Sequence, residues 1–269
     1  MIDLHCHILP GIDDGPKTRE EAIAMCRLAF EDGCRAMVAT PHQRRGRWWN
    51  SDRGAIADLA RDLQAGLGTE LRILVGGEVH VDSELLAEVE KLPEGGICTL
   101  AGSRYLLIEL DDRGRAGEAI SLVHELAVAG WIPVVAHPEF IPWLAGDLEL
   151  TARLVSLGAR MQLTAMSVTG DFGRPPQQTT HALIDAGLVH FIASDCHGIR
   201  RRPPGLKRAY QTVAARWGEE AARLFLVDGP RAVIEDRPLI AVAAAPEEAP
   251  GEALAEAPLG EPAAEGGTS

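Results

Sequence analysis

The chain has 269 residues, of which 46% are apolar and only 4% aromatic, so a large core must be built from Ala, Val, Leu and Ile. No run of eighteen apolar residues occurs, which excludes a transmembrane helix. We expect no membrane insertion, and the net charge of −13 argues against nonspecific nucleic-acid binding, so no nucleic acid is expected as a partner. The acidic N-terminus lacks the basic region of a signal peptide, and five unpaired cysteines favour a reducing cytoplasm.

The composition changes sharply near residue 240. Residues 240–269 contain six glutamates and no Lys or Arg, and are otherwise rich in Ala, Pro and Gly. Because large apolar residues are too few to offset the entropy of ordering, we predict a disordered tail. A peripheral helix or a partner-binding arm is the alternative. Residues 1–239 are predicted to form the folded domain.

Short apolar runs, which predict strands, alternate with amphipathic segments, which predict helices, throughout residues 1–239. The predicted strands are 2–5, 36–40, 71–75, 105–110, 132–136, 159–163 and 189–193. The predicted helices are 17–31, 53–66, 83–91, 115–129, 148–157, 176–186 and 205–216. The first is typical, since Thr18 can cap its start and Gly33 can stop it. This alternation predicts a parallel sheet, and seven repeats favour a barrel over two open sheets.

Histidines and carboxylates follow six of the seven predicted strands. In a parallel α/β barrel the C-terminal strand ends converge on one face, where the chemistry takes place. Both members of His5-x-His7 and of Asp195-x-His197 point the same way, because strand side chains alternate with period two. Mixed imidazole and carboxylate ligands suit Mn, Fe, Zn or Mg. We therefore predict a metal site built from His5, His7, Asp14, His42, Glu78, Glu109, His137, Asp195 and His197.

These nine side chains exceed the needs of one ion, so two or three ions are expected, with Glu78 as the first candidate for a bridging ligand. Each histidine alone could be an ordinary core or cap residue. The shared placement of the whole set favours a metal site. Of the other histidines, His124 and His181 are assigned to helix surfaces and His190 to a strand start, while His80 stays ambiguous.

The segments that carry these residues resemble a known superfamily. They are MIDLHCHILPGIDDG (1–15), ATPH (39–42), YLLIE (105–109), VAHPE (135–139) and FIASDCH (191–197). In order and spacing they resemble the polymerase and histidinol phosphatase (PHP) superfamily, and most closely its bacterial manganese-dependent tyrosine-protein phosphatases of capsule and exopolysaccharide gene clusters. The resemblance covers about residues 1–235 and implies an α/β fold, a distorted (β/α)7 TIM-like barrel with a trinuclear manganese site.

The resemblance also implies roles for individual residues. One ion is held by His5, His7, Glu78 and Asp195, a second by Glu78, Glu109 and His137, and a third by Asp14, His42 and His197. Arg202 matches an arginine near the substrate phosphate. The implied catalytic residues are thus Arg202, His42 and Asp14, with His42 as one candidate proton donor to the leaving group.

This sequence departs from the family pattern at several positions. Phe140 stands where an arginine commonly follows His-Pro-Glu, so one phosphate contact is missing, and Thr164 replaces an expected asparagine. The segment after His42 is unusually basic and aromatic. We place Arg44, Arg45, Arg47 and Trp48 at the rim of the site, to bind an acidic phosphopeptide or an aromatic leaving group, with a solvated loop as the equal alternative.

The implied activity is hydrolysis of phosphotyrosine on protein by a metal-activated hydroxide. A bacterial tyrosine kinase that controls exopolysaccharide synthesis is the expected substrate and partner. Phosphoryl transfer depends on charge stabilisation, and a phenolate leaving group with a pKa of about 10 needs little help. Two or three bound cations also explain how so acidic a chain binds an anion.

Other functions compete with this one. A small-molecule phosphatase of histidinol-phosphatase type is the main alternative, and a catalytically inactive metal-binding scaffold is disfavoured because all nine ligand positions are filled. The spacing C-x5-R of thiol-dependent tyrosine phosphatases occurs from Cys98 to Arg104 and from Cys196 to Arg202. Thiol catalysis is disfavoured, because the first precedes a strand and the second lacks a glycine-rich phosphate loop. Cys6 is expected in the core, facing away from the metals.

Overall fold

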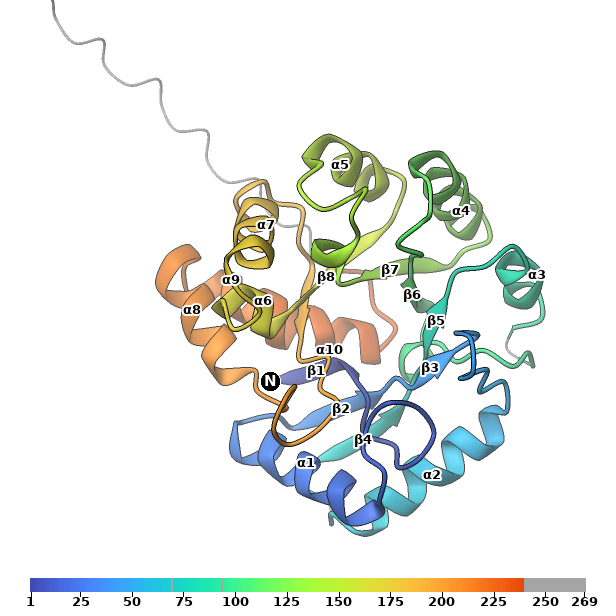
Figure 1. The fold of residues 1–269 in the computed structure, drawn as a ribbon, viewed down its shortest axis with the longest axis vertical. Coiled ribbons are helices and arrows are strands. Elements are labelled where there is room, and N and C mark those ends of the chain that lie inside the picture. The colour runs from blue at the N-terminus through green and yellow to red at the C-terminus, as the bar shows by residue number, and fades with distance from the viewer. Residues whose placement is uncertain (69, 93, 240–269) are drawn as a thin grey trace, which may run out of the picture.

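The structure, a computed structural model, describes residues 1–68, 70–92 and 94–239. The predicted tail, residues 240–269, lies outside the described residues, and the boundary at 239 stays a prediction. The strands are β1 (Ile2–Cys6), β2 (Ala36–Ala39), β3 (His42–Gln43), β4 (Arg72–Val75), β5 (Glu78–His80), β6 (Tyr105–Glu109), β7 (Ile132–Ala136), β8 (Arg160–Thr164) and β9 (Phe191–Ala193). The strands lie inside and the helices outside (Figure 1).

The longer helices are α1 (Arg19–Glu31), α2 (Arg53–Ala65), α4 (Ala116–Val128), α5 (Leu148–Ser156), α7 (Arg174–Asp185) and α8 (Lys207–Trp217). Shorter ones are α3 (Leu85–Val89), α6 (Ala165–Thr169), α9 (Glu219–Arg223) and α10 (Gly229–Ile234), with 3-10 turns at Leu100–Gly102 and Pro138–Phe140 and a π-turn at Leu224–Asp228. Thr18 caps α1 as predicted, accepting a hydrogen bond from the Glu21 amide. In the part of the chain that the structure describes, no helix has the length and apolarity to cross a membrane.

All strand pairs are parallel and fall into two sheets, β1-β2-β4 and β3-β5-β6-β7-β8-β9. The chain continues from β2 into β3 and from β4 into β5, so the second sheet extends the first. The ring closes between its first and last members, where the Asp195 amide donates to the His5 carbonyl and the His7 amide donates to the Cys196 carbonyl. The described strands thus form a distorted (β/α)7 barrel, which confirms the predicted fold class.

The seven predicted strands and seven predicted helices are all present, with ends shifted by one or two residues. Sequence analysis missed β3 and β5, and also α6, α9 and α10. The first two are short and polar, and they pair because neighbouring strands hold them in register, His42 opposite Glu78 and His80 opposite Glu109. No hydrophobic pattern could have revealed them.

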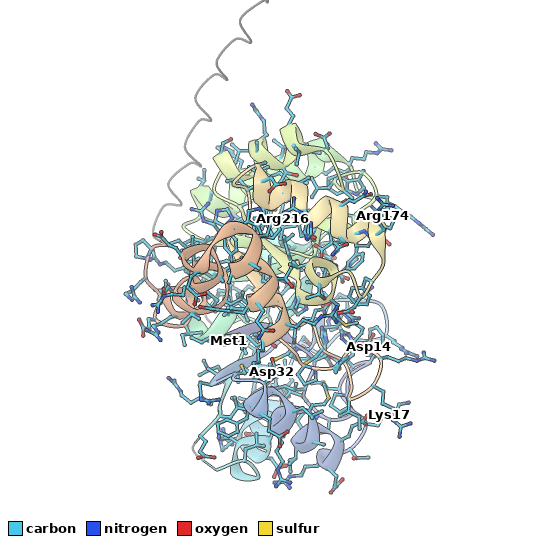
Figure 2. The ribbon with its side chains drawn as sticks, turned by 90° about the vertical axis from the view of Figure 1, so that its left-hand side faces the viewer. Met1, Asp14, Lys17, Asp32, Arg174 and Arg216 are labelled. Atoms are coloured by element: carbon cyan, nitrogen blue, oxygen red, sulfur yellow. The ribbon has the colours of Figure 1, made fainter. Side chains whose placement is uncertain are left out.

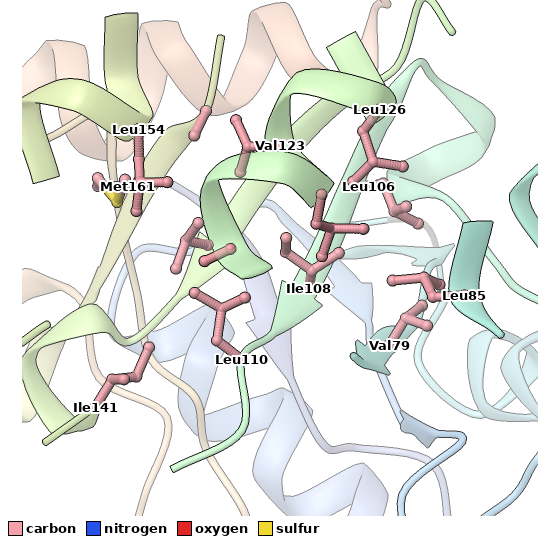
Figure 3. Packing of buried hydrophobic residues seen from close by; sticks show 14 of the residues in the cluster. Val79, Leu85, Leu106, Ile108, Leu110, Val123, Leu126, Ile141, Leu154 and Met161 are labelled. Carbon is pink, nitrogen blue, oxygen red and sulfur yellow. The ribbon is translucent and has the colours of Figure 1, made fainter. Parts of the chain in front are cut away.

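Alternate residues of each strand pack on opposite faces. Leu106 and Ile108 of β6 pack outward against Val123 and Leu126 of α4 (Figure 3). Leu107, between them, packs inward with other residues of the barrel interior, which are Leu4, Val38, Val134, Ala136 and Phe191. Glu109, two residues further along β6, continues the inward face and so reaches the top of the barrel.

An irregularity in β1 aims the first two histidines into the barrel. The register with β2 shifts between Asp3 and Cys6. Leu4 packs in the barrel interior, whereas Cys6 packs outward with the α1 and α2 residues, as predicted, and its thiol donates to the Val38 carbonyl. His5 and His7 therefore face the barrel mouth, a typical effect of a bulge beside a functional site.

Candidate metal centre and active site

Side chains from six strand ends converge at the barrel mouth. Four groups have ligand atoms within 4.8 Å of one another: His7, Asp14, His42 and His197; His5, His137 and Asp195; His5, His7 and Glu78; and His42, Glu78 and Glu109. All nine predicted ligands occur in these groups, which together are called the metal cluster below. The groups overlap through shared residues, as expected for several neighbouring ions.

Glu78 is the hub of the metal cluster. Its side chain is fully buried, and its carboxylate lies 3.4 Å from His5 Nε2, 3.4 Å from His7 Nε2, 2.6 Å from His42 Nδ1 and 2.8 Å from His137 Nε2. A carboxylate that faces four imidazoles has the position of a bridging ligand, which was the role predicted for Glu78. The groupings differ from the implied sets in three respects: Glu109 groups with His42, His137 groups with His5, and His7 also joins the third set.

The tautomers of His5 and His7 support a site for cations. Gln162 donates its amide to the Leu163 carbonyl, so its oxygen faces His5 Nδ1 at 2.7 Å and accepts a proton from it. Asp13 accepts in the same way from His7 Nδ1 at 2.8 Å. The two Nε2 atoms therefore turn their lone pairs toward each other at 3.2 Å. A proton or a cation between them is required to hold this arrangement.

Buried atoms without hydrogen-bond partners mark the same place. His42 Nδ1 and Glu78 Oε2 lie 2.6 Å apart, but neither makes a hydrogen bond of acceptable geometry. Unpaired buried polar atoms are costly and rare. Two such atoms beside each other, in a ring of further imidazoles and carboxylates, fit a site for a divalent ion.

The electrostatic potential of the cluster favours positive charge. Burial lowers the pKa of His5, but the Asp195 and Glu78 carboxylates outweigh it and raise that pKa to about 9. Burial raises the pKa of Asp14, yet His197 and His42 hold it well below its usual range. Divalent ions satisfy the same field while displacing the imidazole protons.

The backbone is strained where ligands leave the strands. His137 follows β7 with φ of 35°, and Asp195 follows β9 with φ of 51°, in the left-handed region that non-glycine residues rarely adopt. Such strain costs about 1–3 kcal/mol per residue and typically persists at functional sites. Here it turns both side chains into the mouth.

The metal cluster forms the floor of a cavity of about 390 Å³. Five carboxylates line this cavity, from Asp14 (labelled in Figure 2), Glu78, Glu109, Asp112 and Asp195. Among the described residues, two arginines line it, Arg45 and Arg202. With neutral histidines the cavity is strongly negative, so it would repel a phosphate dianion unless bound cations reverse the field.

Comparison with known proteins identifies the family of this chain. Residues 1–235 match the family model described as capsular polysaccharide synthesis, CpsB/CapC. The chain belongs to the CpsB/CapC family. The tyrosine-protein phosphatase YwqE of Bacillus subtilis (strain 168) is 34% identical over 223 residues, 82% of this chain and 86% of the relative. The tyrosine-protein phosphatase CpsB of Streptococcus pneumoniae is 30% identical over 244 residues, which cover 88% of this chain and 99% of the relative.

A solved structure supports the same assignment. It belongs to a study of B. subtilis YwqE and S. pneumoniae CpsB, which that study describes as unique metal-dependent tyrosine phosphatases. The solved chain and this chain superpose with a TM-score of 0.83 and are 30% identical, and the match covers 89% of this chain and 96% of the solved one. Dihydropyrimidinase from Brevibacillus agri shares the fold alone, at 11% identity and TM-score 0.52 over 88% of this chain and 71% of that one. The CpsB/CapC match confirms the resemblance stated from the sequence motifs.

Two arginines of this CpsB/CapC chain line the cavity beside the metal cluster. Arg202 lines the cavity, makes a close ion pair with Asp195, and leaves its buried Nε without a partner. Arg45 also lines the cavity, with Nη1 3.0 Å from Glu109 Oε1 and 2.9 Å from His42 Nε2. Arg45 can donate to Nε2 only when that nitrogen is unprotonated, and Nδ1 of a neutral His42 ring then carries the proton that faces Glu78.

The rest of the predicted rim does not line the cavity. Arg44 is buried, pairs with Asp82 through Nε and Nη2, and stacks on Trp49. This engagement makes it a structural residue, which departs from its expected role as a substrate contact. Trp48 stacks on the His42 ring at 5.2 Å between centroids, and Arg47 covers Trp48. Trp48 therefore acts on the site by orienting His42.

Three residues that contact the cluster were not among the predicted ligands, and the sequence leaves His80 ambiguous. Asp13 holds His7 and accepts from the His42 amide, Gln162 holds His5, and His80 lies 3.3 Å from Glu109. Asp13 could have been found from its place beside Asp14. Gln162 could not, because nothing in the pattern of β8 marks its side chain as facing a histidine from β1.

The two cysteines of the C-x5-R spacings are buried core residues. Cys98 and Cys196 pack with Cys6 and the α1 and α2 side chains, and neither lines the cavity. Burial raises the pKa of Cys98 to about 11, which disfavours the reactive thiolate. Arg104 pairs instead with Asp236. Both observations support the prediction that thiol catalysis does not operate here.

Proposed function

We propose that this chain is a metal-dependent protein-tyrosine phosphatase. The proposal rests on one observation: histidines and carboxylates suited to bind cations gather at the floor of a cavity that Arg45 and Arg202 also line. The two relatives named above are tyrosine-protein phosphatases, and they match the chain over most of its length. A bacterial tyrosine kinase that controls exopolysaccharide synthesis is the proposed substrate, and the cytoplasm the proposed location.

The metal cluster fits two or three divalent ions. Its ligands would be His5, His7, Asp14, His42, Glu78, Glu109, His137, Asp195 and His197, with Glu78 as the bridging carboxylate. A ligand set of imidazoles and carboxylates without thiolates suits Mn²⁺, our proposed ion, and also Fe, Zn or Mg. When bound, such ions neutralise phosphate charge and lower the pKa of water toward neutrality.

The residues of the chain supply position and charge. Arg202 and Arg45 stand beside the cluster, where each can donate to phosphate oxygens once the substrate replaces the Asp195 or Glu109 contact. Asp13 and Gln162 fix the tautomers of His7 and His5, so that Nε2 of each faces the site. The phenolate of phosphotyrosine has a pKa of about 10, so it can leave without full protonation.

Phosphate release separates this function from the alternatives. Purified protein is analysed for metal content, then assayed with a tyrosine-phosphorylated peptide, the same peptide phosphorylated on serine, and histidinol phosphate. We expect bound Mn²⁺ or a related ion and hydrolysis of the phosphotyrosine peptide that a chelator abolishes and Mn²⁺ restores. Faster hydrolysis of histidinol phosphate would indicate a small-molecule phosphatase. No hydrolysis of any ester by metal-loaded protein would indicate an inactive scaffold.

A further inference from the structure

An aromatic wall stands beside the metal cluster in the same cavity. It consists of Phe140, in the turn after β7, and Phe172, in the loop between α6 and α7. The two rings pack edge to face, with centroids 5.5 Å apart at 78°. Phe140 is 40% exposed although it is large and apolar, so part of its ring is free to contact a ligand.

The aromatic wall lies close to His137, one of the proposed metal ligands. Phe140 comes three residues after His137, and the centroids of these two rings are 6.2 Å apart. Ile141 and Leu110, both buried, extend the apolar lining behind it. The floor of the cavity is therefore polar and charged, whereas one of its sides is apolar.

This combination selects a particular shape of substrate. The organic group of a phosphate ester bound at the floor can lie against the wall, and a flat ring presents more area to two phenylalanines than a short alkyl chain does. Offset or edge-to-face contacts between aromatic rings are favourable beyond the area they bury. A phosphoserine side chain has one methylene group and no ring, so the Phe140 and Phe172 rings would stay exposed to water when it binds.

We propose that Phe140 and Phe172 bind the tyrosyl ring of the substrate and so make the site selective for aryl over alkyl phosphate esters. The inference rests on the proposed phosphatase function and adds the residues that recognise its leaving group. Phe140 occupies the position at which the sequence motif has an arginine. This chain thus exchanges a phosphate contact for a ring contact, and leaves the phosphate to Arg45 and Arg202.

Binding of two inert phosphonates tests the wall without turnover. In benzylphosphonate a methylene group replaces the ester oxygen of a tyrosyl phosphate, and ethylphosphonate lacks the ring. Calorimetry with Mn²⁺-loaded protein is expected to show tighter binding of benzylphosphonate. Phe140→Ala should weaken benzylphosphonate about five- to tenfold and leave ethylphosphonate within twofold. Phe172→Ala should act in the same direction, and the double variant should show less than the product of the two effects, because the rings touch.

Controls separate the wall from general damage. Phe140→Tyr keeps a ring and should keep the preference, and Leu28→Ala, at a residue of similar exposure on α1, should change neither affinity. Equal binding of both phosphonates by the parent protein overturns the inference, as does an equal loss of both in Phe140→Ala. If the ring preference holds but no phosphotyrosine peptide is hydrolysed, the proposed function fails while the wall stands.

Discussion

The interior and the mouth of the barrel carry different chemistry on the same inward face of the strands. In the barrel interior, Leu107 of β6 and Val134 of β7 are fully apolar and packed against other strands. Beyond them, at the end of β6 and just after β7, the chain places Glu109 and His137 in the metal cluster with Glu78. Apolar packing stabilises the interior, whereas the side chains at the mouth are arranged as they would be to hold cations. Stability and function are thus assigned to different levels of one barrel.

The largest expected effect follows from removing a ligand at the mouth. His5→Ala and Asp195→Ala should each lower turnover by about a thousandfold or more, because an ion is lost or misplaced. The melting temperature of metal-free protein should also fall, because each change removes one partner from the buried contact between His5 and Asp195 and leaves the other without its opposite charge. Phosphate release, metal analysis and thermal unfolding measure the three quantities. Normal rates in either variant would show that the mouth is not the site.

The converse change in the barrel interior should act on stability alone. Leu107→Ala deletes a fully buried side chain and should lower the free energy of unfolding by about 2–5 kcal/mol. Activity per folded molecule should stay near that of the parent, because the ligands at the strand ends keep their positions. Urea unfolding and assays well below the melting temperature test this. A thousandfold loss of activity in a folded Leu107→Ala protein would contradict the division between the two levels.

Two adjacent arginines sharpen the comparison at the rim. Arg45→Ala should lower kcat/KM about ten- to a hundredfold with little loss of stability, because its side chain lines the cavity. Arg44→Ala should instead destabilise the fold by about 1–3 kcal/mol, since it leaves Asp82 without its partner. Parallel kinetics and unfolding of both variants distinguish the roles. Reversed effects would restore Arg44 as the substrate contact.

The smallest effect concerns a histidine at the closed end of the barrel. Burial, with a contribution from Arg160, lowers the pKa of His190 to about 3, and its Nδ1 accepts from the Met161 amide. The unfolded chain, with a pKa near 6.5, takes up the proton first, so stability falls as pH drops below about 6.5. The loss should reach about 2 kcal/mol at pH 5. His190→Asn, which keeps an acceptor, should remove this acid sensitivity in urea unfolding measured across that range; an unchanged pH dependence would refute it.

Sequence patterns located the parts of the fold whose cause is local. Runs such as 132–136 are apolar over the length of a strand, and Thr18 caps α1 through its own side chain, so neither depends on a distant residue. Strands β3 and β5 could not be found this way, because their pairing comes from neighbours. The candidate ligands were found because they recur at strand ends. The wall of Phe140 and Phe172 was not, since its two rings come from different loops.

The sequence by itself determined the order of strands and helices, the family, and which side chains follow the strands. These properties depend on periodicity and on motifs within a few residues. The tertiary structure decided which ligands share a neighbourhood, which nitrogen of His5 and His7 faces the site, and why Arg45 lines the cavity while Arg44 does not. Those outcomes depend on the closure of the barrel, which brings together atoms that are far apart along the chain and that no local pattern relates.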